Sequence, residues 1–72
     1  MSLFLARLQQ ATDVYDVTVV QEGFTLEPKG GQQPGFDDVV RSVLNHDGSE
    51  FAAFPTSNGV GGYDSVLIIP IV

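Results

Sequence analysis

The 72-residue sequence predicts a small α+β domain, in which an N-terminal helix precedes a ββαββ unit. Two observations predict this class. Four segments rich in β-branched and aromatic residues alternate with turn-forming residues, and one stretch between the second and third has helical periodicity. We therefore expect a single domain over residues 1–72, with one helix packed on a four-stranded, mainly antiparallel sheet.

The first element is expected to be a helix over residues 1–12. Met1, Phe4, Leu5 and Leu8 fall on one helical stripe, and most of the residues between them favour helix. The competing interpretation of the same apolar residues is a short strand.

A β-hairpin is expected to follow. Apolar and polar residues alternate from Tyr15 to Val20, which is typical of a strand with one wet face. Residues 21–23 supply a turn, and Phe24 to Glu27 form the returning strand. Pro28 ends that strand because proline has no N–H to donate to a ladder.

The clearest element is a helix from Phe36 to His46. Its apolar residues recur at i, i+3, i+4, i+7 and i+8, which places them on one stripe facing the sheet. Asp37 and Asp38 complement the dipole in the first turn, and Gly48 is suited to the C-terminal cap. The residues before this helix, 29–35, have no apolar side chains, and we expect them to form a loop.

Two further strands are expected, over residues 50–54 and 63–72. Pro55 ends the first, and a second glycine-rich loop joins the two. The middle of the last strand is apolar on both faces, so we expect both faces to be covered. Pro70 restricts this strand to a sheet edge or to a break near its end. The element order is similar to β-grasp-like and split β-α-β topologies, and this likeness implies no activity.

Composition excludes several chemistries. The chain has no cysteine, so disulfides, thiolate nucleophiles and cysteine-based metal centres are absent, and a reducing, cytoplasmic location is expected. Three basic residues against nine acidic ones give a net charge of −6, which repels nucleic acid and anionic lipid. The apolar run Val66 to Val72 is too short to span a membrane. The acidity either solubilises a small domain or serves recognition of a basic partner.

No motif predicts a catalytic, cofactor-binding or metal-binding residue. Residues 59–62 are glycine-rich, but the Lys-Ser/Thr and helix of a phosphate loop do not follow. Residues 45–50 resemble part of a calcium loop, yet Val43 stands where an acidic ligand is needed. His46 is the only histidine, and no Gly-x-Ser-x-Gly elbow accompanies it. We therefore expect a protein that is not an enzyme.

Acidic residues near the strand ends are the candidate partner-binding residues. If the first and last strands pair, several of them form one acidic patch for a basic protein surface. The predicted set, with one neighbouring aromatic residue, is Asp13, Asp16, Glu22, Glu27, Tyr63 and Asp64.

The uncharged, strand-prone C-terminal segment suggests self-association, because an exposed apolar strand must be covered or paired. Val66, Ile68 and Ile69 would form that contact in a homodimer, unless the N-terminal helix covers them. The leading hypothesis is a small acidic interaction module, with the profile of an inhibitor, immunity protein, antitoxin or phage-type regulator. The alternative is a homo-oligomeric assembly subunit built through this strand.

Overall fold

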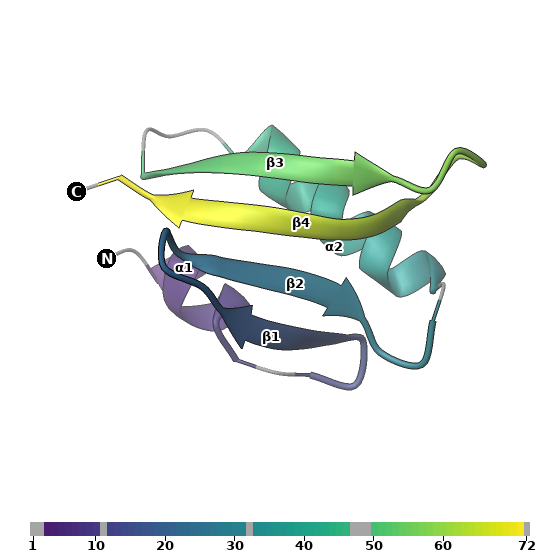
Figure 1. Cartoon of the computed structure of the whole chain (residues 1–72), viewed down its shortest axis with the longest axis horizontal. Coiled ribbons are helices and arrows are strands. Elements are labelled where there is room, and N and C mark those ends of the chain that lie inside the picture. The colour runs from purple at the N-terminus through teal and green to yellow at the C-terminus, as the bar shows by residue number, and fades with distance from the viewer. Residues whose placement is uncertain (1–2, 11, 32, 47–49, 72) are drawn as a thin grey trace.

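A computed structural model describes residues 3–10, 12–31, 33–46 and 50–71, and it confirms the predicted element order. Two helices and four strands make up a small α+β domain (Figure 1). In chain order they are α1 (Leu3–Leu8), β1 (Tyr15–Val19), β2 (Phe24–Pro28), α2 (Pro34–Asn45), β3 (Phe51–Ser57) and β4 (Tyr63–Pro70).

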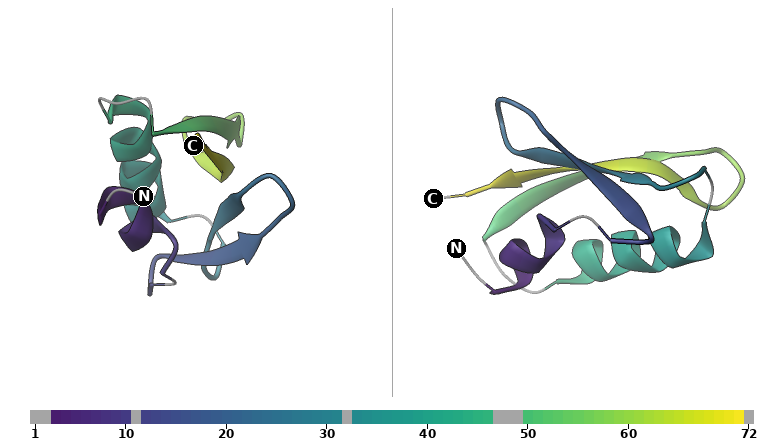
Figure 2. Two further views of the ribbon diagram at one scale, coloured as in Figure 1. Left: turned by 90° about the vertical axis from the view of Figure 1, so that its left-hand side faces the viewer. Right: turned by 90° about the horizontal axis from the view of Figure 1, so that it is seen from below.

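The strands form one antiparallel sheet in the order β1-β2-β4-β3. Because β4 lies antiparallel between β2 and β3, those two strands run parallel to each other, and α2 connects them. This is a split β-α-β arrangement with β1 added at one edge. Both helices lie on the same side of the sheet (Figure 2), so the other face, called the outer face below, has no helix over it.

The core lies between the helices and the sheet. Phe36 and Val40 of α2 are completely buried against Leu26 of β2 and against Val66 and Ile68 of β4. Four of the five residues of the predicted stripe face the core, whereas Leu44 is 43% exposed. This packing stabilises a helix whose valines give it low intrinsic propensity. The helix begins at Pro34, so residues 34 and 35 belong to it and not to the predicted loop. Gly48, the predicted cap, lies outside the described residues, and His46 is the C-cap.

Helix α1 is shorter than the predicted span of residues 1–12. It ends at Leu8, with Leu5 and Leu8 in the core. Thr12 lies in a turn, because its Oγ1 accepts hydrogen bonds from the backbone N–H groups of Val14 and Tyr15, at 3.0 and 3.3 Å. A threonine side chain that bonds the backbone in this way competes with continued helix.

The last strand, β4, is an interior strand, and within this chain the helices cover one of its two faces. The helices cover only the face that carries Val66 and Ile68. Pro70 is the last residue of β4, which confirms the predicted break and not the edge position. The proline is tolerated because β2 pairs with β4 only as far as Ile68.

Strand β3 continues through Pro55 to Ser57, although Pro55 was expected to end it. The N–H of Ile71 donates to the carbonyl of Glu50 at 2.7 Å. This bond shows which residues of β3 direct their backbone groups toward β4 and which direct them away. Counting from that bond, position 55 directs its backbone away from β4, toward the open edge. The missing N–H of Pro55 therefore removes no bond to β4.

Gly23 is required where the β1–β2 turn meets β4. Reciprocal backbone bonds of 3.0 and 3.3 Å between Val20 and Gly23 close this turn. A Cβ atom at Gly23 would lie 2.0 Å from the carbonyl oxygen of Ile68 and 2.9 Å from the ring of Pro70. Only glycine lets the two backbones approach so closely. Among the described residues, no helix has the length and hydropathy needed to span a membrane.

Candidate protein-binding surface

Most of the acidic residues gather at one end of the domain. β2 and β3 finish, and β1, β4 and α2 begin, at the right-hand end of Figure 1. Six of the nine acidic residues lie there, although β1 and β4 do not pair with each other as supposed. We call this group the acidic end; its members are Asp13, Asp16, Glu27, Asp37, Asp38 and Asp64.

The structure therefore brings together four of the five acids in the predicted partner-binding set. Asp13, Asp16, Glu27 and Asp64 lie at the acidic end, and all four are exposed. Glu22 lies at the opposite end of the sheet, in the turn between β1 and β2. A surface that includes Glu22 together with the acidic end would have to extend along the whole sheet.

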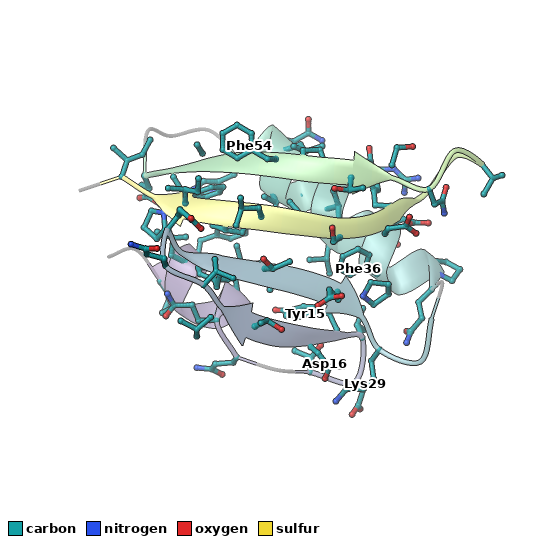
Figure 3. The ribbon with its side chains drawn as sticks, in the orientation of Figure 1. Tyr15, Asp16, Lys29, Phe36 and Phe54 are labelled. Atoms are coloured by element: carbon teal, nitrogen blue, oxygen red, sulfur yellow. The ribbon has the colours of Figure 1, made fainter. Side chains whose placement is uncertain are left out.

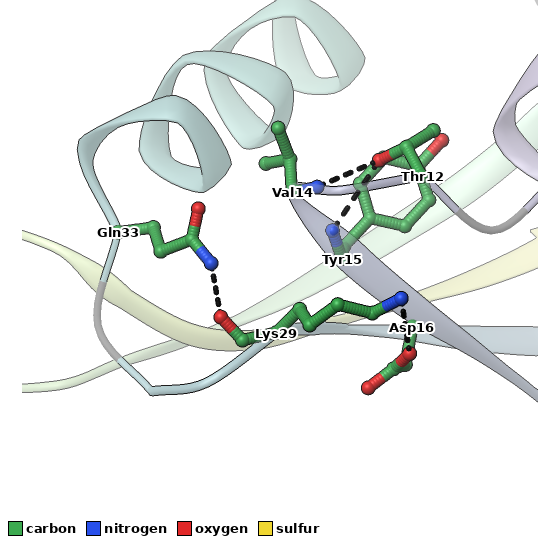
Figure 4. A network of polar contacts seen from close by, with 6 residues as sticks. All are labelled: Thr12, Val14, Tyr15, Asp16, Lys29 and Gln33. Carbon is green, nitrogen blue, oxygen red and sulfur yellow. Dashed lines mark hydrogen bonds and ion pairs between the residues drawn. The ribbon is translucent and has the colours of Figure 1, made fainter.

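Two of these acids repel each other within the sheet. Asp16 and Glu27 are direct cross-strand partners in β1 and β2. Like charges in this position destabilise a sheet by about 0.2–1 kcal/mol. Lys29 Nζ approaches Asp16 Oδ1 at 3.4 Å, with both side chains about half exposed (Figures 3 and 4). An exposed pair of this kind compensates the repulsion only in part.

The backbone around these acids is fixed by hydrogen bonds. The Thr12 turn joins the start of β1, and the Thr12 N–H donates to the Tyr15 carbonyl at 3.2 Å. The amide of Gln33 donates to the carbonyl of Lys29 (Figure 4). Burial raises the pKa of the Tyr15 phenol, whose hydroxyl lies 3.5 Å from the Arg7 carbonyl. The charged side chains of this region are therefore attached to a backbone that hydrogen bonds hold in place.

Asp37 has a role that the sequence analysis missed. Its Oδ1 accepts a hydrogen bond of 3.1 Å from the backbone N–H of Tyr63, which ties the start of α2 to the start of β4. Asp38, its neighbour, makes only an exposed pair with Arg41 at 2.9 Å. Tyr63, predicted to contact a partner, is half-buried and packs against the core. No local pattern signals this tether, because 26 residues separate Asp37 from Tyr63.

The glycine-rich loop between β3 and β4 is organised by one asparagine. Asn58 Oδ1 accepts hydrogen bonds from the N–H groups of Val60 and Gly62, at 2.9 and 3.0 Å. Gly59 and Gly61 adopt φ angles of +83° and +91°, which favour glycine. The loop presents Val60 at its tip, 78% exposed, beside the acidic end.

The outer face of the sheet is divided into an apolar half and a polar half. Phe54, Leu67 and Ile69 lie on β3 and β4, and Phe54 is 54% exposed. The polar half lies on β1 and β2 and consists of Asp16, Thr18, Thr25 and Glu27. In the predicted self-association set, Val66 and Ile68 belong to the core of this one chain. Only Ile69 offers side-chain surface to a second copy.

The end of the domain opposite the acidic end is aromatic. The rings of Phe4 and His46 stack with centroids 4.2 Å apart, and Phe51 lies 5.6 Å from His46. We call these three residues the aromatic end. His46 Nε2 also lies 3.4 Å from Glu50 Oε2. The single histidine thus holds α1, α2 and β3 together. Across residues 3–10, 12–31, 33–46 and 50–71, no three potential metal ligands converge.

Comparison of this chain with models of protein families, with curated proteins and with solved structures gives no match.

Proposed function

We propose that this chain is a small, non-enzymatic protein-interaction module that binds a basic surface of another protein. The contact surface would comprise the acidic end and the adjoining outer face of the sheet. One observation carries the proposal: six acidic residues gather beside a sheet face that no helix covers. Inhibitors, immunity proteins, antitoxins and phage-type regulators have this profile of a small, acidic, cysteine-free domain.

The two parts of this surface would contribute differently. The exposed carboxylates would speed and orient the encounter with a basic partner, an effect that added salt weakens. The apolar side chains of the outer face, of which Phe54 is the most exposed, would supply affinity by leaving water in the complex. Because apolar side chains and carboxylates lie side by side on this surface, it suits a partner that presents an apolar residue flanked by lysine or arginine.

A matched pair of charge reversals tests the proposal. Glu27 and Glu22 are both exposed, and they lie at opposite ends of the same hairpin. Partners are first captured on immobilised wild-type protein at low ionic strength, and the affinity of a purified partner is then measured by titration calorimetry. We expect Glu27→Lys to weaken binding about tenfold, because a charge that faced cations is inverted. Glu22→Lys should change the affinity less than about twofold.

Two results would contradict the proposal. One is an affinity that is insensitive to added salt, since a charge-guided contact must weaken as ionic strength rises. The other is an equal loss for Glu27→Lys and Glu22→Lys, because the acidic end would then have no special part in binding.

A homo-oligomeric assembly subunit is the second candidate, and the exposed apolar half of the outer face favours it. Phe54, Leu67 and Ile69 could pair with the same residues of another copy. Light scattering over a dilution series distinguishes the two functions. A defined oligomer that Phe54→Ser converts to monomer would favour the assembly subunit over the proposed module.

A further inference from the structure

The two edges of the sheet are protected differently. At the β3 edge, Pro55 removes one of the outward N–H groups, a common protection against added strands. The β1 edge contains no proline and no lysine. Its ladder with β2 is fixed at both ends, by the Val20–Gly23 bonds and by the 2.9 Å bond from the Lys29 N–H to the Val14 carbonyl.

This register shows which backbone groups of β1 are open. Residues 14, 16, 18 and 20 face β2, so Tyr15, Val17 and Val19 direct their backbone groups outward. The Thr12 turn occupies the outward groups of Tyr15. The N–H and C=O groups of Val17 and Val19 are left at the open edge. The hairpin tip there extends away from the helices (Figure 2).

We propose that this open edge binds an extended segment of the partner, which adds a strand beside β1. The inference rests on the proposed function and specifies how the basic partner is held. Peptides that add to a sheet edge gain affinity from main-chain hydrogen bonds and specificity from alternate side chains. Both faces of β1 offer such side-chain contacts.

On the helix side, the edge favours an apolar side chain. Val19 is 81% exposed, although it belongs to the face of β1 that carries buried Tyr15. Beside it is a hollow of about 240 Å³, whose lining is apolar apart from Gln9 and comprises Gln9, Val17, Val19, Gly23, Phe24 and Pro70. An apolar residue of the added strand would cover Val19 and occupy part of this hollow.

On the outer face, the edge favours a basic side chain. Asp16 lies directly opposite Glu27, and this repulsion is only partly compensated by Lys29. A lysine or arginine on the added strand, opposite Asp16, would relieve it. Since side chains alternate along a strand, the fitting segment alternates apolar and basic residues.

A second copy of the chain fits the edge less well. The antiparallel register that bonds Val17 to Val19 of the other copy places Asp16 opposite Val20, where it finds no cation. It also brings together two bodies that each carry a net charge of −6. A basic strand supplies a cation opposite Asp16 and is attracted to the acidic domain instead of being repelled by it.

The test uses a blocked peptide of alternating valine and lysine, with a valine–glutamate peptide of equal length as control. Amide hydrogen exchange is followed by NMR. We expect the valine–lysine peptide to slow exchange at Val17 and Val19 by about tenfold, with little change at Thr18, which already bonds β2. N-methylation of the peptide along one edge should abolish this protection, and Asp16→Asn should weaken binding several-fold.

A backbone variant supplies an independent readout. Val17→Pro removes one outward N–H and leaves the bonds to β2, as Pro55 does in β3. This variant should reduce the affinity for the peptide about tenfold. If it fails to fold, protection of Val17 and Val19 in the wild-type protein remains the test of strand addition. Peptide binding without protection of Val17 and Val19 would overturn the strand addition but leave the proposed function standing. Protection in a dimer without peptide would also overturn it, in favour of a second copy. Failure of every basic probe to bind would overturn both proposals.

Discussion

The two ends of the domain are stabilised by different interactions. At the acidic end, side-chain oxygens of Asp37, Thr12 and Asn58 accept hydrogen bonds that hold the backbone, and the carboxylates other than Asp37 are exposed. At the other end, Gly23 lies against β4, and Phe4 stacks on His46. Close packing carries most of the stability of a small domain, whereas exposed charges carry little. The exposed carboxylates of the acidic end, unlike Asp37, can therefore be altered for binding at little cost to the fold.

The largest expected effect is at Gly23. In Gly23→Ala the new methyl would meet the carbonyl oxygen of Ile68 at 2.0 Å, so the backbone of β4 or the turn must move. We expect a loss of about 3 kcal/mol or more in the free energy of unfolding, measured by urea denaturation. Gly35→Ala is the control, because its methyl would meet only Val14 carbons at 3.5 Å or more.

Gly35 is the second residue of α2, and alanine at a position it can adopt without strain restricts the unfolded chain more than glycine does, so Gly35→Ala should stabilise the protein by about 0.4–1 kcal/mol. The two substitutions add the same methyl group with opposite expected signs. If Gly23→Ala is as stable as wild type, the close approach of the turn to β4 does not exist in solution.

The next effect concerns the aromatic end. Phe4→Ala removes a half-buried ring that stacks on His46 and also lies 6.0 Å from Phe51. We expect a loss of about 2 kcal/mol, from apolar burial and from the aromatic contact. Leu3→Ala, one residue earlier and 68% exposed, should change stability by less than about 0.5 kcal/mol. Equal losses would show that α1 docks through another face.

The acidic end should respond less, and unevenly. Asp37→Ala leaves the Tyr63 N–H without its acceptor, which should cost about 1.5 kcal/mol. Asp38→Ala removes only an exposed pair with Arg41, which should cost about 0.3–0.5 kcal/mol. Both variants lose one charge from the first turns of α2, so the dipole does not explain a difference. Thermal unfolding of the two variants side by side checks it, and equal midpoints would contradict the tether.

The fold could be predicted further than the surface, for a physical reason. Periodicity in the sequence records which side chains are buried, so the element order and all of the α2 stripe except Leu44 were predicted correctly. Strand order depends on pairing between distant segments, so the interior position of β4 between β2 and β3 could not be read from its own residues. Pro55 was misjudged for the same reason. A proline would end an interior strand, but β3 is an edge strand, in which a proline can be accommodated.

For the candidate surface, the sequence indicates which residues are charged but not which of them are neighbours. Sequence alone identified the acids Asp13, Asp16, Glu27 and Asp64, because exposed charges are recognisable by type. It could not assign Glu22 to the far end, nor could it show that Asp16 and Glu27 are direct partners. Cross-strand neighbours are set by the register, which the turn and its Gly23 fix.

The smallest expected effect is at alkaline pH. Burial raises the pKa of Tyr15 above its usual 10.0, so the folded protein holds this proton more tightly than the unfolded chain does. The resulting stabilisation is complete below pH 10 and is lost as pH rises through the folded pKa. Tyr15→Phe keeps the buried ring and removes the titration. The free energy of unfolding should therefore fall less steeply above pH 10 in Tyr15→Phe than in wild type. The same slope in both proteins, from urea denaturation at several pH values, would show that the Tyr15 hydroxyl is in water and not buried beside the Arg7 carbonyl.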